Sequence, residues 1–125
     1  MDEDGLSNRI IGAAIEVHRA LGPGLLESAY RVALAHELRL LGHVVEAERV
    51  VGIRYKDLDV PTAFRLDLLI EDSVIVELKS VEKLLPAHSA QLLTYLRFCD
   101  KRLGLLLNFN EVTLKRGIVR IVNQF

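Results

Sequence analysis

The sequence lacks several features that would assign it to common protein classes. It has one cysteine, Cys99, so no disulfide forms within the chain, and its histidines have no Cys or His partners at zinc-ligand spacing. No stretch approaches the ~20 apolar residues of a membrane span. Acids occupy residues 2–4, where a secretory signal places bases, so we expect a cytoplasmic protein without membrane contact. The apolar helical stretch around Cys99 predicts a buried, unreactive thiol.

A surplus of positive charge is also missing. The formal net charge is −1, whereas a domain that binds a phosphate backbone by itself is usually basic. The charges are unevenly distributed, because residues 1–48 contain four Lys or Arg against eight Asp or Glu, and residues 49–125 contain twelve against nine. The second part therefore contains either a weak phosphate-binding track or ordinary solvated cations, and the sequence leaves both open.

No linker, repeat or low-complexity segment divides the chain. Its 125 residues suffice for one core, so we expect a single domain over residues 1–125. Apolar residues at three- and four-residue steps predict a helix over 6–21, ended by the Gly-Pro-Gly at 22–24. A second helix is expected over 25–41, with Gly42 as its stop signal.

The remaining segments alternate between strand and helix patterns. Period-two alternation predicts a strand over 45–55, followed by a turn and two more strands joined by a polar hairpin turn near Asp72. Pro86 is suited to the first turn of a third helix, which we expect to reach Cys99. The apolar run 103–109 predicts a buried strand, and 117–122 a further one. The predicted fold is α/β, in the order ααβββαβ(β), and the third helix allows a later strand to join the sheet in parallel.

The hairpin brings three charged residues together. Asp67 stands ten residues before Glu77, and a turn centred near Asp72 places the two directly opposite each other, with Cβ atoms about 4.5–5.5 Å apart. Because side chains alternate along a strand, Lys79 shares the face of Glu77, while Leu78 points into the core. The sequence therefore predicts two acids and one ammonium group in a single patch.

Two facing carboxylates favour a shared cation, since like charges raise a pKa or require compensation. Mg²⁺ meets this requirement because it prefers one or two carboxylates with water and phosphate oxygens, and Mn²⁺ is the alternative ion. Lys79 would then orient the attacking water. The competing interpretation is a solvated hairpin face with ordinary cross-strand pairs.

Several short motifs point to a known family. Residues 24–30, GLLESAY, contain Gly24, Glu27 and Tyr30 in the pattern Gly-x-x-Glu-x-x-Tyr. The Asp67 strand, the strand VELK and the helix motif QLLTY at residues 91–95 follow in order. Over nearly its whole length the chain resembles the GxxExxY proteins, a branch of the PD-(D/E)xK nuclease superfamily, although Leu66 rather than proline precedes Asp67. The resemblance implies a restriction-endonuclease-like fold, in which helices flank a mixed sheet on both faces.

The resemblance also implies roles for the motif residues. Asp67 and Glu77, with the Leu78 carbonyl, would hold the metal, and Glu27 would complete its shell or bind a metal-bound water. For Glu27 the competing interpretation is an acid that favours the positive end of a helix dipole.

On the third helix, Gln91 and Tyr95 lie on one stripe together with His88. Gln91 would bind the water or a phosphate oxygen, and Tyr95 would brace the same group. For His88 an ordinary polar role is the main expectation.

These features lead to one functional hypothesis and one rival. The hypothesis is a Mg²⁺-dependent nuclease that hydrolyses phosphodiester bonds of DNA or RNA, with Lys79, Gln91 and Tyr95 as catalytic residues. The rival is a non-catalytic module that keeps the nuclease fold for binding or assembly with a protein partner. Half of the residues are hydrophobic, which also predicts a homo-oligomer.

Overall fold

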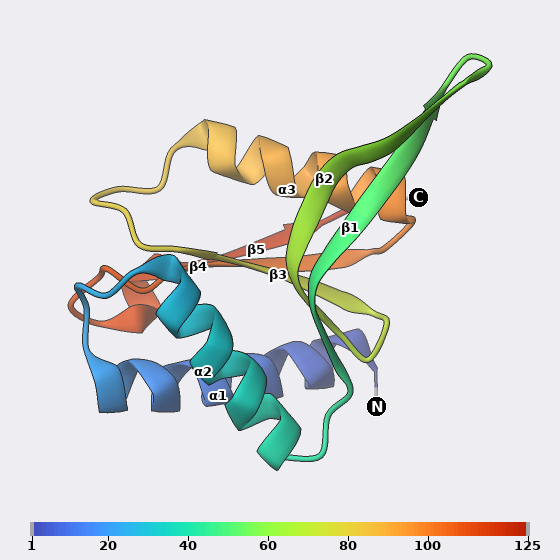
Figure 1. Cartoon of the computed structure of the whole chain (residues 1–125). Coiled ribbons are helices and arrows are strands. Elements are labelled where there is room, and N and C mark those ends of the chain that lie inside the picture. The colour runs from blue at the N-terminus through green and yellow to red at the C-terminus, as the bar shows by residue number, and fades with distance from the viewer. Residues whose placement is uncertain (1, 125) are drawn as a thin grey trace.

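The chain forms a five-stranded sheet with helices on both faces (Figure 1). The computed structural model describes residues 2–124. The elements follow in the order α1 (Glu3–Leu21), α2 (Glu27–Leu40), β1 (Val45–Tyr55), β2 (Leu58–Ile70), β3 (Val74–Lys79), α3 (Pro86–Cys99), β4 (Leu103–Asn108), a short 3₁₀ helix η1 (Leu114–Gly117) and β5 (Ile118–Val122). This confirms the predicted α/β class and element order. Of the helices in this described part, none is long and apolar enough to cross a membrane.

The sheet is mixed, as predicted. Its strands lie in the spatial order β1-β2-β3-β4-β5. The pair β3 and β4 is parallel, whereas all other neighbours are antiparallel. Helix α3 connects the parallel pair, because two parallel strands need a crossover rather than a tight turn.

The two faces of the sheet form separate cores. Helices α1 and α2 cover one face and α3 covers the other (Figure 1). On β3, Val74, Val76 and Leu78 pack in the core beneath α1 and α2, whereas Ile75 packs in the core beneath α3. Alternation along the strand therefore directs Glu77 and Lys79 toward the α3 side.

Some local details differ from the sequence prediction. Helix α1 begins at Glu3 rather than at residue 6, because the Asp2 side chain accepts the Gly5 N–H at 2.7 Å and caps the helix there. Helix α2 begins at Glu27, two residues later than expected, because Leu26 is still extended, with φ −68° and ψ 150°. Its end at Leu40 agrees with the expected stop, since Gly42 has φ +90°, a conformation that favours glycine. Cys99 is half-buried rather than buried, because it lies at the last residue of α3 beside a cavity.

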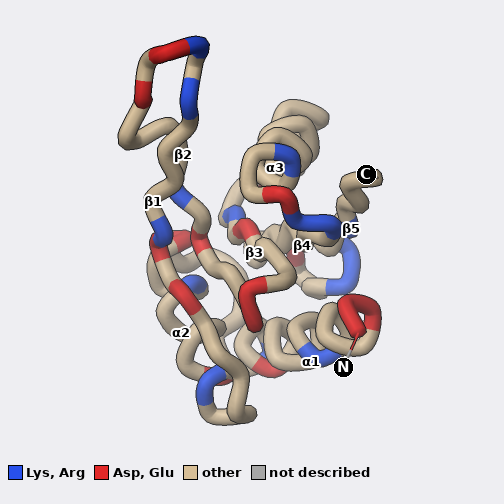
Figure 2. The backbone as a smooth tube through the Cα atoms, turned by 90° about the vertical axis from the view of Figure 1, so that its right-hand side faces the viewer, with Lys and Arg blue, Asp and Glu red and all other residues tan. Residues whose placement is uncertain are grey.

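Strands β1 and β2 continue beyond the sheet as a two-stranded projection. Before Asp67, β2 pairs only with β1, and we call the projecting part of the two strands, residues 50–65, the β1–β2 arm (Figure 1). Basic and acidic segments both occur along it (Figure 2). Arg54 lies 2.8 Å from Asp59, and Arg65 lies 3.5 Å from Glu48 at the base. The arm therefore does not present a surface of one charge.

Candidate active site

The β2–β3 hairpin has the register that the sequence predicts. Its ladder runs through three pairs, Leu68–Val76, Leu69–Ile75 and Ile70–Val74. The next position places Asp67 opposite Glu77. The Asp67 N–H donates to Glu77 Oε1 at 3.2 Å, and the Leu78 N–H donates to Asp67 Oδ2 at 2.9 Å. Each carboxylate is thus anchored by the backbone of the neighbouring strand and keeps a second oxygen for another partner.

Strand β2 is irregular at Asp67. Leu66 packs beneath α3, but Leu68 packs beneath α1 and α2, although residues two apart in a regular strand share a face. Across from Asp67 on β1, Glu48 has φ +55°, which is uncommon for a residue with a side chain. The side-chain alternation therefore shifts at this point, and the Asp67 carboxylate reaches across to the backbone of β3.

The two carboxylates interact strongly with each other. Glu77 is only 5% exposed. Burial, and next the charge of Asp67, raise the pKa of Glu77 to about 9, while the Lys79 ammonium opposes the rise. Without a cation, Glu77 therefore keeps its proton at neutral pH, because two adjacent carboxylates cannot both ionise at low cost.

This donor set fits a divalent cation such as Mg²⁺. Both side chains offer hard oxygen atoms, and a cation would replace the proton that Glu77 otherwise holds. Among residues 2–124, no three His, Cys, Asp or Glu side chains gather as a metal-binding group. Glu27 therefore does not join Asp67 and Glu77. Two carboxylates suit Mg²⁺, which fills its other positions with water and phosphate oxygens.

Leu78 and Lys79 complete the end of β3. The Leu78 side chain is 1% exposed in the core, so this residue offers the site only its backbone. The charge of Lys79 acts on Glu77, as its effect on the Glu77 pKa shows. The Lys79 carbonyl accepts the N–H of Phe109 at 2.8 Å, which fixes the strand end against the end of β4.

Helix α3 brings Tyr95 to the carboxylate pair. Burial, then the charges of Glu77 and Asp67, raise the pKa of Tyr95 above its ordinary value. Its ring stacks on Phe64, with centroids 4.3 Å apart and an interplanar angle of 5°. Gln91 is exposed one helical turn earlier. His88 has a structural role, because its Nδ1 accepts the Leu85 N–H at 3.0 Å at the start of the helix.

Two residues of the Gly-x-x-Glu-x-x-Tyr motif have structural roles. Gly24 has φ +103°, a backbone conformation that favours glycine. Tyr30 is fully buried, and its hydroxyl donates to the Gly22 carbonyl and accepts the Leu25 N–H. Its ring stacks on Phe109, with centroids 4.6 Å apart. The motif therefore holds the loop before α2 in one conformation.

The same loop is joined to the end of β3. The Ser80 hydroxyl donates to the Leu25 carbonyl at 2.8 Å, one residue after Lys79. Glu27 is exposed at the first position of α2, on the helix that this loop begins. The loop thus connects the Glu27 end of α2 to the strand that carries Glu77.

Tyr30→Phe should reduce the free energy of unfolding by about 1–3 kcal/mol, because the Gly22 carbonyl and the Leu25 N–H lose the buried hydroxyl that they share. Stacking on Phe109 should persist, since the ring is unchanged. Urea unfolding at neutral pH measures the difference. The control is Tyr55→Phe at the exposed end of β1, and an equal effect of the two substitutions would contradict the role of the Tyr30 hydroxyl.

Sequence reasoning missed two residues that shape the site. Asn108 is fully buried, and its Nδ2 donates to the Val81 carbonyl at 2.9 Å while its Oδ1 accepts the Val81 N–H at 3.1 Å. It thereby positions the segment that follows Lys79. An amide at the end of an apolar run is a signal for such a role. Phe64, which stacks on Tyr95, carries no comparable signal.

The free energy of unfolding should depend on pH through Glu77. Its pKa is 4.5 in the ordinary state and about 9 in the folded protein, so between these values the folded state binds the extra proton. The free energy of unfolding of metal-free protein should therefore fall as pH rises from about 4.5 to about 9. Glu77→Gln should flatten this dependence and stabilise the protein at the alkaline end, because the amide stays neutral.

Urea unfolding in EDTA, at several pH values across this window, measures the effect. Glu82→Gln at an exposed position is the control and should retain the wild-type slope. Parallel slopes for wild type and Glu77→Gln would show that Glu77 does not carry the proton.

Comparisons with known proteins agree with this geometry. A solved structure titled "Crystal structure of SSO0001" is similar at 23% identity and a TM-score of 0.56, which shows a shared fold. The similarity covers 78% of this chain and 50% of SSO0001, so the chain spans half the length of that protein. No curated protein gave a significant match. A family model described as the PD-(D/E)XK nuclease superfamily matches residues 4–121, almost the whole sequence, and the chain therefore belongs to this superfamily.

Proposed function

We propose that the protein is a divalent-metal-dependent nuclease that hydrolyses phosphodiester bonds of DNA or RNA. The observation that supports this most is the Asp67–Glu77 pair, in which two adjacent carboxylates are held by each other's strands and one is buried. Such a pair is unfavourable as a purely structural feature, because burial and like charge both oppose ionisation. A bound divalent cation removes this cost.

In this proposal Asp67, Glu77 and the Leu78 carbonyl hold Mg²⁺, with Mn²⁺ as the alternative. The bound ion supplies charge neutralisation at the phosphate and lowers the pKa of water. Lys79 positions the attacking water and stabilises the negative charge that develops on the phosphate. Lys79 lies at the end of β3, on the same face of the sheet as Glu77, and this position supports the role.

Three further residues have supporting roles in the proposal. Tyr95 lies within the electrostatic field of the carboxylate pair and braces the water or phosphate, and Gln91 binds the same group from the preceding turn.

We also propose that the chain belongs to the GxxExxY branch. Gly24 and Tyr30 stabilise the loop before α2, which leaves Glu27 as the motif residue with an exposed carboxylate. Glu27 would bind a metal-bound water once substrate is present.

Cleavage assays on labelled single- and double-stranded DNA and RNA test the proposal. We expect cleavage with Mg²⁺ or Mn²⁺ and none in EDTA, and we expect calorimetry to detect Mg²⁺ binding. Glu77→Gln should remove both cleavage and Mg²⁺ binding, because the amide supplies no negative charge. Wild-type protein that cleaves no substrate with either ion would refute the proposal.

The second candidate function is a non-catalytic binding or assembly module that acts with a protein partner. Exposed apolar side chains on and beside α2 favour it, because Leu26, Val32 and Leu40 are 78%, 66% and 68% exposed. Leu26 and Val32 line one shallow apolar groove on α2, and exposed apolar surface of this kind is typical of protein interfaces. An inactive wild-type protein that still bound a partner protein would favour this candidate.

Self-association stays a prediction. A homo-oligomer with a specific interface should bury more than ~1,000 Å² in total. If a second copy covers the α2 surface, light scattering at tens of micromolar should give at least a dimer mass, and Val32→Glu should give a monomer. Lys115→Glu, an exposed change away from α2, is the control. A monomer mass for the wild type would contradict the prediction.

A further inference from the structure

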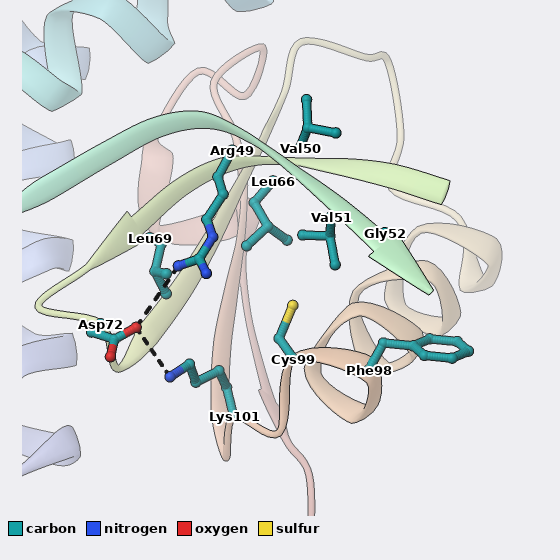
Figure 3. A pocket seen from close by; sticks show the side chains of 10 residues that line it. All are labelled: Arg49, Val50, Val51, Gly52, Leu66, Leu69, Asp72, Phe98, Cys99 and Lys101. Carbon is teal, nitrogen blue, oxygen red and sulfur yellow. Dashed lines mark hydrogen bonds and ion pairs between the residues drawn. The ribbon is translucent and has the colours of Figure 1, made fainter. Parts of the chain in front are cut away.

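A second feature of the α3 side is a cavity that the proposed chemistry does not use. It has a volume of about 390 Å³ and lies between β1, β2, the β2–β3 turn and the C-terminal end of α3 (Figure 3). Its apolar lining includes Val51, Leu66 and Leu69. The Arg49 guanidinium and the Cys99 thiol point into it (Figure 3). The cavity therefore combines an apolar wall with a cation, which suits a ligand that has an apolar part and an anionic group.

One carboxylate of the chain occupies the cationic side of this cavity. Asp72 Oδ1 lies 3.2 Å from Lys101 Nζ and 3.9 Å from Arg49 Nη1 (Figure 3). The Asp72 side chain is 74% exposed, so this interaction is weak and readily replaced. Arg49 also contacts Glu46 at 3.3 Å on the surface. An external anion can therefore take the position of Asp72 between the two cations.

The cavity lies beside the carboxylate pair. Leu66 lines the cavity and is followed directly by Asp67. On α3, Cys99 lines the cavity. Tyr95 precedes Cys99 by four residues, and the charges of the carboxylate pair raise the pKa of Tyr95. Four residues of helix span about 6 Å, one turn. The cavity and the candidate active site are therefore neighbours on the same side of the sheet.

We propose that this cavity binds one unpaired nucleotide of the substrate, next to the phosphate that is cleaved. The base packs against Val51 beside the Cys99 thiol, and its phosphate binds Arg49 and Lys101 in place of Asp72. This inference rests on the proposed nuclease function and specifies its substrate as single-stranded nucleic acid or an unpaired end. A base stacked in a duplex must be extruded before it enters such a cavity, which costs a few kcal/mol.

Cys99 provides a direct readout of cavity occupancy. It is the only cysteine in the chain, so a thiol-specific reagent modifies one known position. Burial raises the pKa of this thiol while Arg49 and Lys101 oppose the rise, which agrees with both cations lying near the sulfur. In EDTA, where no cleavage is expected, a bound nucleotide should slow the modification of Cys99.

The experiment measures the modification rate of Cys99 in the wild-type chain with oligo(dT), or with its duplex with oligo(dA), using strands long enough for the duplex to stay paired at the assay temperature. We expect the single strand at saturation to slow modification by about tenfold or more, since a base that fills the cavity excludes the reagent. The duplex should have little effect. Equal protection by the duplex would overturn the inference, because it would place binding outside the cavity.

Matched variants test the anion position. Asp72→Asn removes the negative charge that lies between Lys101 and Arg49 and should tighten oligo(dT) binding several-fold, measured by fluorescence anisotropy. The turn should persist, because Asp72 has φ +51° and asparagine tolerates that conformation. Asp59→Asn makes the same change in charge near the end of the arm and should have little effect. An equal gain in oligo(dT) affinity for both variants would overturn the inference, since it would reflect only the net charge of the protein.

A second pair of variants tests the cationic side of the cavity by removing an arginine. Arg49→Ala should weaken binding by about tenfold, the usual effect of losing a charge-assisted contact. Arg54→Ala removes an arginine from the same strand, outside the cavity, and should change binding much less. Cooperative urea unfolding of each variant confirms that it is folded. Equal weakening in both variants would overturn the inference.

The outcomes separate this inference from the nuclease proposal. Protection of Cys99 that depends on Arg49, without cleavage under Mg²⁺ or Mn²⁺, would support the cavity as a nucleotide site and refute the nuclease. Metal-dependent cleavage, without protection of Cys99 and without an effect of Arg49→Ala, would support the nuclease and overturn the cavity assignment.

Discussion

Replacing Lys79 by alanine should leave Mg²⁺ affinity nearly unchanged and reduce cleavage by about 10²–10³, the usual cost of losing one group that stabilises developing charge. The ammonium is not a ligand of the cation, so metal binding does not depend on it. It lies on the face of Glu77 and acts on the charge of the carboxylate pair. Calorimetry with Mg²⁺ and the initial rate of cleavage measure the two effects separately.

Lys83→Ala is the matched control for this prediction. Lys83 is exposed four residues beyond Lys79 in the segment after β3, so its removal causes the same change in net charge. We expect its cleavage rate to stay within a few-fold of wild type. A similar loss in both variants would mean that the lysines contribute general attraction for the substrate, and Lys79 would lose its catalytic assignment.

Asp67→Asn should abolish both Mg²⁺ binding and cleavage. The substitution keeps the size of the side chain and an oxygen that can accept the Leu78 N–H, but it removes the negative charge that attracts the cation. It also removes the charge of Asp67, which after burial is the largest cause that raises the pKa of Glu77, so this pKa should fall while the metal site is lost. Calorimetry, cleavage assays and the pH dependence of unfolding measure the three consequences.

Asp57→Asn in the turn between β1 and β2 is the control for this variant. Asp57 is exposed and outside the candidate site, so metal binding and cleavage should remain. Unchanged Mg²⁺ affinity in Asp67→Asn would show that the cation binds elsewhere. Partner binding that is unaffected by both Lys79→Ala and Asp67→Asn, in a protein that cleaves nothing, would favour the non-catalytic module.

The sequence by itself determined the element order and the register of the site hairpin. These follow from local patterns, because alternation identifies strands, three- and four-residue spacing identifies helices, and Pro86 marks the start of α3. The polar turn near Asp72 fixes the register, so the opposition of Asp67 and Glu77 could be predicted without any long-range contact. The motif residues similarly identified the superfamily, which the family model confirms.

Only the tertiary structure decided how these residues are surrounded. The high pKa of Glu77 arises from burial, next from Asp67, and α3 covers the sheet face that Glu77 shares. The backbone irregularity at Asp67, the hydrogen bonds of Tyr30 to its loop and the buried amide of Asn108 depend on contacts between distant or adjoining elements. The cavity beside Cys99 needs three separate segments to meet, residues 49–52, 66–72 and 98–101. Local patterns determine which face of an element is apolar, whereas burial and cavities depend on which elements pack together, because burial is a property of the assembled chain.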